Sequence, residues 1–271
     1  MTKFGLYSPM ADNCPAHLIA LAERLADASG SVVRRYFRAP LVVSDKADLS
    51  PVTAADREAE SMIRAILASQ RPGDGIIGEE HGSKNVDADY VWVIDPIDGT
   101  KAFITGRPTF GTLIGLLHHG RPVLGIIDQP VTGDRWLGAA GRATTLSGSA
   151  AKVRGCASVA AAMLGATTPD MFIGDEAAAF RRLAAAAKFT VYGGDCIAYG
   201  LLASGFQDLV VEASLSLYDF VALAPVVAGA GGVMTDWQGK PIDVNSGGRV
   251  IAAGDARVHA EALEILQGGR G

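Results

Sequence analysis

The spacing of hydrophobic positions predicts two amphipathic helices near the start of the chain. Over residues 15–38, apolar side chains recur every three or four positions, the period of one helix face: Leu18, Leu21, Ala22, Leu25, Val32, Val33 and Tyr36. Residues 52–70 repeat this period with Ala59, Met62, Ile63, Ile66 and Leu67. A short β-branched run at 41–44 and a polar turn at 45–51 separate the two predicted helices.

Short apolar and β-branched runs then replace the helical period, which predicts strands separated by Gly, Pro and Asp turns. These runs cover residues 76–77, 90–94, 110–117, 122–128, 134–138 and 143–146. His118-His119-Gly120 is typical of a hairpin turn. A metal site built from the two histidines is a weaker alternative, because adjacent residues point to opposite faces of a strand.

Beyond about residue 150, predicted strands and helices alternate, which favours helices packed on a sheet. The strands are 160–166, 189–192, 209–213, 232–235 and 250–253, and the helices are 175–187, 195–204, 219–230 and 255–267. We therefore predict two halves. Residues 1–150 combine helices with a largely antiparallel sheet, and residues 151–271 form an α/β half, with a glycine-rich hinge at 138–155. Pro225 falls inside a predicted helix, which it is expected to kink.

Composition narrows the class of protein. The chain has 271 residues, 49% of them hydrophobic and 20% charged, which is ordinary for a globular enzyme. The net charge is −5 and no stretch is densely basic, so a nucleic-acid partner is not expected. No apolar run reaches the ~18 residues of a membrane span, and the first residues lack the apolar core of a signal peptide. These features predict a soluble, cytoplasmic protein, and its three scattered cysteines are expected to be reduced.

Residues 90–103 contain the most candidate functional groups. Their sequence is Tyr-Val-Trp-Val-Ile-Asp-Pro-Ile-Asp-Gly-Thr-Lys-Ala-Phe. Its apolar start predicts a buried strand, and Pro96 predicts a sharp bend beyond the strand's end. The carboxylates of Asp95 and Asp98 and the freed carbonyl of Ile97 are hard oxygen ligands, which suit Mg²⁺ or Mn²⁺. Gly99 and Thr100 are expected to open a helix whose N–H groups attract an anion. Turn capping by the two aspartates is the alternative.

Acidic residues also mark three other predicted element boundaries. Asp56 lies in the first turn of the second helix, Glu79 and Glu80 follow a strand, and Asp219 precedes an apolar helix. Each has an ordinary structural explanation: a helix-dipole partner, a solvated loop or an N-cap. Together with the central aspartates, however, they favour a shared metal site.

The residues that carry a family resemblance are three segments in a specific order and spacing. They are Gly78-Glu79-Glu80, the segment Trp92-Val93-Ile94-Asp95-Pro96-Ile97-Asp98-Gly99-Thr100, and Tyr218-Asp219 running into Ala230-Gly231-Gly232-Val233. Over nearly its whole length the chain resembles the inositol monophosphatase superfamily of Mg²⁺-dependent phosphatases. The resemblance implies a five-layered α-β-α-β-α sandwich, combining α+β and α/β organisation, and a homodimer.

The resemblance also implies roles for particular residues. Glu79, Asp95 and the Ile97 carbonyl resemble ligands of a first metal ion. Asp95, Asp98 and Asp219 resemble ligands of a second, with Asp95 bridging. Asp56, Glu80 and Thr100 match positions that orient the attacking water and a third, weaker metal. The backbone of Gly99 and Thr100 would hold the phosphate, and Lys46 would lie in a mobile loop over the site.

This assignment agrees with the chemistry of phosphate esters, which hydrolyse extremely slowly without a catalyst. Two cations can lower the pKa of a bound water, align it for in-line attack and stabilise the leaving alkoxide. A Thr100 hydroxyl that passes its proton toward Asp56, or alternatively Glu80, would orient that water. Metal binding should also stabilise the fold.

Two acids of the second half bear on the choice of ester. The resemblance places Glu212 against the alcohol portion of the substrate and Asp195 in an adjacent loop, where inositol phosphatases commonly carry an uncharged residue. Two carboxylates suit the ammonium and imidazole groups of histidinol phosphate. The segments Asp98–Phe103, Asp128–Pro130 and Gly193–Tyr199 look most like histidinol-phosphate phosphatases. Helix capping by Asp195 is the alternative.

Other activities stay open at this point. Lys101 departs from the inositol monophosphatase pattern, but a lysine there also occurs in the branch that cleaves 3′-phosphoadenosine phosphates. An inositol-1-monophosphatase or a nucleotide phosphatase is therefore the second reading. The third is a catalytically silent member kept as a metal-dependent binding protein, which the complete set of expected ligands disfavours.

Overall fold

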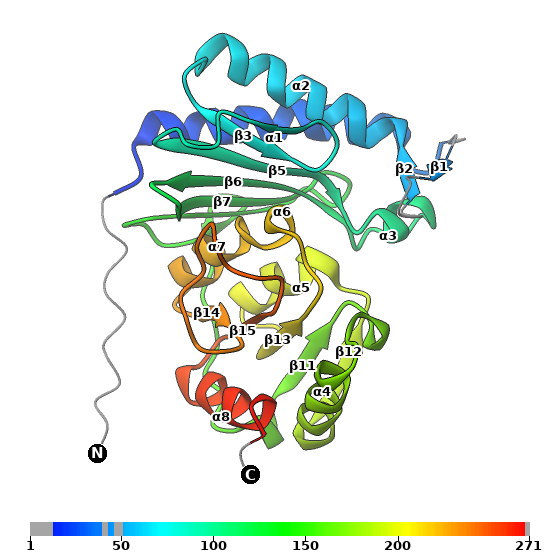
Figure 1. The fold of residues 1–271 in the computed structure, drawn as a ribbon, viewed down its shortest axis with the longest axis vertical. Helices are drawn as coiled ribbons and strands as arrows, with labels where there is room; N and C mark the ends of the chain where they lie inside the picture. The colour runs from blue at the N-terminus through cyan, green and yellow to red at the C-terminus, as the bar shows by residue number, and fades with distance from the viewer. Residues whose placement is uncertain (1–12, 40–42, 46–50, 269–271) are drawn as a thin grey trace.

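A computed structural model describes residues 13–39, 43–45 and 51–268, and five layers follow one another along its long axis (Figure 1). Helices α1 and α2 cover the outer face of the first sheet, and α5, α6 and α7 lie between the two sheets. Helices α4 and α8 cover the outer face of the second sheet. The helices are α1 (Ala16–Tyr36), α2 (Ala54–Gln70), α3 (Thr100–Ile104), α4 (Asp175–Ala186), α5 (Asp195–Ala203), α6 (Leu217–Phe220), α7 (Leu223–Gly229) and α8 (Ala256–Leu266). The predicted five-layered sandwich is confirmed.

The first sheet is largely antiparallel, as predicted. Among the described residues it has eight strands in the order β10-β9-β8-β7-β6-β5-β3-β4, and the β3–β5 pair is parallel. The strands are β3 (Gly75–Gly78), β4 (Gly82–Lys84), β5 (Tyr90–Asp98), β6 (Gly111–His118), β7 (Arg121–Gln129), β8 (Asp134–Ala139), β9 (Thr145–Leu146) and β10 (Ser149–Ala150). A separate antiparallel pair joins β1 (Val43–Asp45) to β2 (Pro51–Thr53).

The second sheet mixes both strand directions. Where the chain is described, its order is β12-β11-β13-β15-β14; β11 runs parallel to β12 and β13, and the other pairs are antiparallel. The strands are β11 (Met163–Ala166), β12 (Phe189–Tyr192), β13 (Leu209–Glu212), β14 (Val233–Asp236) and β15 (Val250–Ala253), with short 3₁₀ turns η1 (Val159–Ala161) and η2 (Pro169–Met171). The division of the chain at residue 150 stays a prediction, although β9 and β10 show that part of the expected hinge is paired strand.

Two local expectations are corrected by the structure. Strand β5 does not stop before Asp95 but continues through Pro96 to Asp98, with an irregularity in its pairing to β6 between Asp95 and Asp98. A β-bulge absorbs the proline and redirects the strand without ending it. The helix predicted over 219–230 is split into α6 and α7, so Pro225 is the third residue of α7. Its missing N–H costs little there, because first-turn amides have no partner within a helix.

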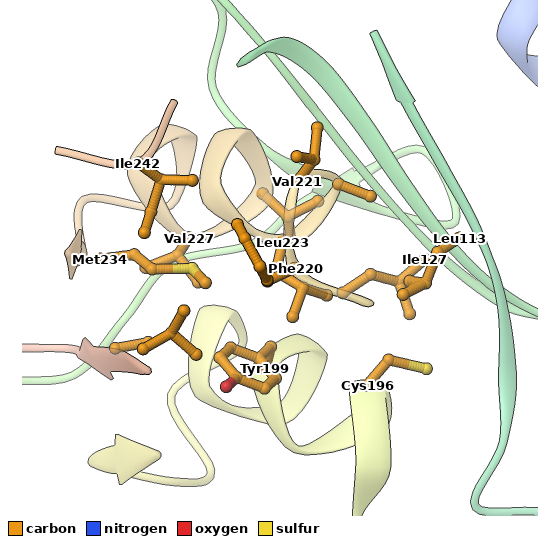
Figure 2. Close-up of a cluster of buried hydrophobic side chains, with 14 of the residues drawn as sticks. Leu113, Ile127, Cys196, Tyr199, Phe220, Val221, Leu223, Val227, Met234 and Ile242 are labelled. Carbon is orange, nitrogen blue, oxygen red and sulfur yellow. The ribbon is translucent and has the colours of Figure 1, made fainter. Parts of the chain in front are cut away.

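The middle layer packs closely against the first sheet through glycines. Phe220 at the end of α6, Val221 just after it and Leu223 at the start of α7 belong to one buried cluster with Leu113 of β6 and Ile127 of β7 (Figure 2). A Cβ placed on Gly125 of β7 would overlap the carbonyl oxygen of Ala222. The absence of a side chain at Gly125 therefore lets the polypeptide between α6 and α7 lie directly on the sheet.

We expect Gly125→Ala to destabilise the fold by about 1–3 kcal/mol, the usual cost of forcing extra volume into a packed core. Gly73→Ala is the matched control, because no described atom lies within 4 Å of a Cβ at that exposed position. Urea unfolding of both variants measures the difference. Equal free energies of unfolding would show that the contact between Gly125 and Ala222 can relax freely.

Among the described residues, no helix combines the length and apolar character that crossing a bilayer requires. The three cysteines, Cys14, Cys156 and Cys196, are buried and unpaired, as predicted.

Candidate metal and phosphate site

Three of the predicted metal ligands meet at the bulge in β5. Asp95 and Asp98 lie on either side of the bulge, and Asp219 reaches the same place from α6. One carboxylate oxygen from each lies within 4.8 Å of the other two. The Ile97 amide donates a hydrogen bond of 3.0 Å to Oδ1 of Asp95, which fixes that buried carboxylate in the bend. The structure thus brings together residues from two segments more than 100 positions apart.

The carboxylates of this cluster raise one another's pKa values. Burial, and then the neighbouring Glu79, Asp98, Asp219 and Asp56, raise the pKa of Asp95 well above its ordinary value. Burial and Asp195 do the same to the pKa of Asp98. Burial raises the pKa of Asp219 to about 7, even though the Ser216 amide donates to its carboxylate. Crowded carboxylates of this kind suit a divalent cation, which removes the repulsion, so this donor set fits Mg²⁺ or Mn²⁺.

Glu79 and Asp56 lie near this cluster, and Glu80 contacts α2. Glu79 follows β3, where its amide donates to the Ile94 carbonyl at 3.3 Å, and its charge acts on both Asp95 and Asp219. Asp56 is buried in the first turn of α2 and its charge also acts on Asp95. The Glu80 carboxylate is 3.6 Å from Nε of Arg57.

Gly99 and Thr100 make the turn that leads from β5 into α3. Gly99 has φ +85°, a left-handed conformation that favours glycine, and it is the N-cap of α3. The predicted helix is confirmed, but it has only five residues, so single amides rather than a large helix dipole would act on an anion. The Thr100 hydroxyl donates to the Ile97 carbonyl at 3.1 Å. Proton transfer toward Asp56 or Glu80 stays a prediction.

Asp195 lies against the Gly99–Thr100 turn, although it is far away in the sequence; this turn, where phosphate binding is predicted, is called the phosphate turn below. A Cβ built on Gly99 would be 3.1 Å from the Asp195 carboxyl carbon, and the Cys196 amide donates to Asp98 at 2.7 Å. Asp195 is not the N-cap of α5: the N-cap is Gly194, and the carboxylate that accepts an amide at this helix end belongs to Asp98. Burial raises the pKa of Asp195 to about 6, and the nearby charge of Lys101 opposes that shift. Asp195 also has a left-handed φ of 43°, which is unusual for a residue with a side chain.

Glu212 is buried beside Asp195 and is held by three donors. The amide and hydroxyl of Thr167 donate to Oε1 at 3.0 and 2.6 Å, and the Tyr199 hydroxyl donates to Oε2 at 2.9 Å. Burial raises the pKa of Glu212 to about 7, and these hydrogen bonds oppose the shift. Thr167 also lies close enough to Asp195 to lower the pKa of that carboxyl, so it is a neighbour of both acids.

Some features of the site could not be found from the sequence. Thr167 has no motif of its own, and Tyr199 ends the Gly193–Tyr199 segment without a predicted role; the roles of both come from the tertiary contact between β11, α5 and β13. The N-cap explanation of Asp219 is half right: Ser216 is the N-cap, and Asp219 completes its capping box while also facing Asp95. Lys46 lies outside the described residues.

Comparisons with known proteins agree with this geometry. The family model described as the inositol monophosphatase family matches residues 15–268. The bifunctional phosphatase IMPL2 of Arabidopsis thaliana, named as chloroplastic, is 48% identical over 96% of this chain and 78% of its own length. The histidinol-phosphatase of Mycobacterium tuberculosis is 35% identical over 93% of this chain and 98% of its own.

A solved structure of an inositol monophosphatase has the same fold. An inositol monophosphatase from Zymomonas mobilis superposes with a TM-score of 0.86 and 48% identity, covering 94% of this chain and all of the other. With the acidic cluster at β5 and α6, these likenesses establish that the chain belongs to the inositol monophosphatase family and is a metal-dependent phosphomonoesterase.

Proposed function

We propose that this phosphatase is a Mg²⁺-dependent histidinol-phosphate phosphatase, which releases histidinol and phosphate. The observation that carries the proposal is the position of Asp195, whose carboxylate packs on Gly99 and shares the neighbour Thr167 with the buried Glu212. Acidic groups beside the phosphate turn would attract the cationic alcohol of histidinol phosphate. The histidinol-phosphatase of M. tuberculosis, 35% identical, supports this choice of substrate.

Within this proposal the acidic residues divide by role. Glu79, Asp95 and the Ile97 carbonyl would hold one cation, and Asp95, Asp98 and Asp219 a second. When bound, the cations supply an acidified water and charge stabilisation of the leaving oxygen. The amides of Gly99 and Thr100 would orient the phosphate. Asp56, Glu80 and the Thr100 hydroxyl would hold the attacking water and a weaker third cation.

Inositol-1-monophosphatase activity is the alternative with an observation behind it. The structural relative at 48% identity is an inositol monophosphatase, and that identity equals the value for IMPL2. Lys101 also offsets the charge of Asp195, which reduces the attraction of the pocket for a cation. A nucleotide phosphatase and a silent binding protein lack such support. Homodimer assembly, a cytoplasmic location and the choice between Mg²⁺ and Mn²⁺ stay predictions.

Phosphate release from three esters tests the proposal. Histidinol phosphate, inositol 1-phosphate and 3′-phosphoadenosine 5′-phosphate are supplied at equal concentration with Mg²⁺. We expect histidinol phosphate to be preferred by about a hundredfold in kcat/KM, equivalent to about 2.7 kcal/mol of transition-state binding. Preference for inositol 1-phosphate would leave the metal chemistry intact but overturn the cationic pocket. Absence of release from all three would favour the metal-dependent binding protein.

A further inference from the structure

The segment that carries Glu79 is fastened to one face of α2. Four α2 residues contact it, at the helical spacing that places them side by side: Arg57, Glu60, Ser61 and Arg64. Ser61 bonds the His81 ring at 3.0 Å, and Arg64 donates to the Gly82 carbonyl. The segment from Gly78 to Gly82 is therefore docked along α2 and is not a free surface loop.

Glu60 is the centre of this attachment. Its side chain is fully buried, and its carboxylate accepts the amides of Glu80 at 2.7 Å and His81 at 3.2 Å. Arg64 balances its charge with a hydrogen bond of 2.6 Å. A buried ion pair is often no more stabilising than an apolar pair of the same size, so stability alone explains it poorly. The Glu60 carboxylate instead fits two successive amides of the Gly78–Gly82 segment.

Gly78 leaves the space that Glu60 occupies. A Cβ on Gly78 would overlap Oε1 of Glu60 and lie 2.8 Å from Nη2 of Arg64. The φ of Gly78 is not in the left-handed region, so space rather than backbone conformation requires a glycine at this position. The glycine of the Gly-Glu-Glu motif and the buried Glu60 thus form one packing unit.

We propose that Glu60, balanced by Arg64, is a positioning residue that sets where the Glu79 carboxylate meets the metal. The backbone of Glu79 is fixed on both sides: its own amide donates to Ile94 on β5, and the next amide donates to Glu60. Asp56 lies one helical turn before Glu60 on α2, so the same helix face places Asp56 and the Glu79 segment. This inference rests on the proposed role of Glu79 as a metal ligand.

The test is Glu60→Gln, which keeps the shape but turns one acceptor into a donor that would face an amide. Mg²⁺ binding is measured by isothermal titration calorimetry and by the Mg²⁺ concentration that gives half of the thermal shift. We expect weakening by about 10–100-fold, the usual effect of removing a group that orients a metal ligand. Hydrogen exchange of residues 79–82 should accelerate, and Gly78→Ala, which displaces the Glu60 carboxylate, should reproduce both effects.

Asp208→Asn is the matched control for loss of a buried carboxylate. Asp208 accepts two bonds of 2.7 Å from Arg154 and one of 2.8 Å from the Met163 amide, all away from the acidic cluster. It should lower thermal stability and leave Mg²⁺ affinity unchanged. Glu79→Gln distinguishes the proposed role of Glu60 as a positioning residue from the proposed role of Glu79 as a metal ligand. If it weakens Mg²⁺ binding while Glu60→Gln and Gly78→Ala do not, the positioning role is wrong. If Glu79→Gln itself has no effect, the ligand assignment fails.

Discussion

Replacing Asp95 with asparagine is expected to abolish phosphate release without weakening the metal-free fold. Asp95 is the proposed bridging ligand, and its buried carboxylate is crowded by Glu79, Asp98 and Asp219. Asparagine keeps the oxygen that accepts the Ile97 amide but removes the charge. We expect kcat to fall by at least about 10³-fold, which corresponds to about 4 kcal/mol of transition-state stabilisation.

The same substitution should have opposite effects on the metal-free and metal-loaded protein. In EDTA, loss of a repelled charge should leave the melting temperature unchanged or raise it. With Mg²⁺, the wild type gains the stabilisation that accompanies ligand binding, and Asp95→Asn should lose most of it. Differential scanning calorimetry in both conditions measures this.

Asp128→Asn is a suitable control, because Asp128 is buried on β7 of the same sheet and paired with Arg135 at 2.6 Å. The Asp128→Asn protein should have a lower melting temperature than the wild type in EDTA, and Mg²⁺ should still raise that temperature. A large drop in the EDTA melting temperature of Asp95→Asn, with its Mg²⁺ response retained, would mean that Asp95 serves the fold and not the metal.

Most elements could be predicted from the sequence because their hydrophobic periods are local. The 3.6-residue period located α1 and α2, the alternation of strands and helices located α8, and the short apolar runs located β6, β7 and β15 within a few residues. The predictions of element boundaries that were wrong concerned places where tertiary contacts decide the structure. Asp98 remains part of β5 because it pairs with Gly111, a contact to which Pro96 gives no clue. The break between α6 and α7 similarly follows from close packing of that chain segment on Gly115 and Gly125.

The residues of the site can also be divided into those that local motifs predicted and those that only the fold shows. Asp95, Asp98 and Asp219 lie in recognisable motifs, and the structure gathers their carboxylates. Glu60 was missed because a glutamate four residues before an arginine is typical of an exposed helix pair, and only the fold shows that it is buried. Thr167 was missed because a threonine after a strand has many explanations. Its importance follows from its contacts with two acids.

The second large effect is expected on the choice of substrate. Asp195→Asn removes a charge beside the phosphate turn, and asparagine can still contact Thr167. A charge-assisted hydrogen bond contributes about 1.5–3 kcal/mol, so kcat/KM for histidinol phosphate should fall by about 10–100-fold. The value for inositol 1-phosphate should stay the same or rise, because that alcohol is uncharged. The measurement is the ratio of the two kcat/KM values in wild type and variant.

Glu212→Gln should behave differently, which makes the pair of variants informative. The Glu212 carboxylate accepts all three of the hydrogen bonds described above, so a glutamine NH₂ group would oppose either Thr167 or Tyr199. Rearrangement of that buried network should lower activity on both esters, with a smaller change in their ratio. Asp175→Asn, an exposed charge in the first turn of α4, is the control and should change neither. If Asp195→Asn lowers both activities equally, Asp195 supports the phosphate turn through its contact with Gly99, and the selection of a cationic substrate lies elsewhere.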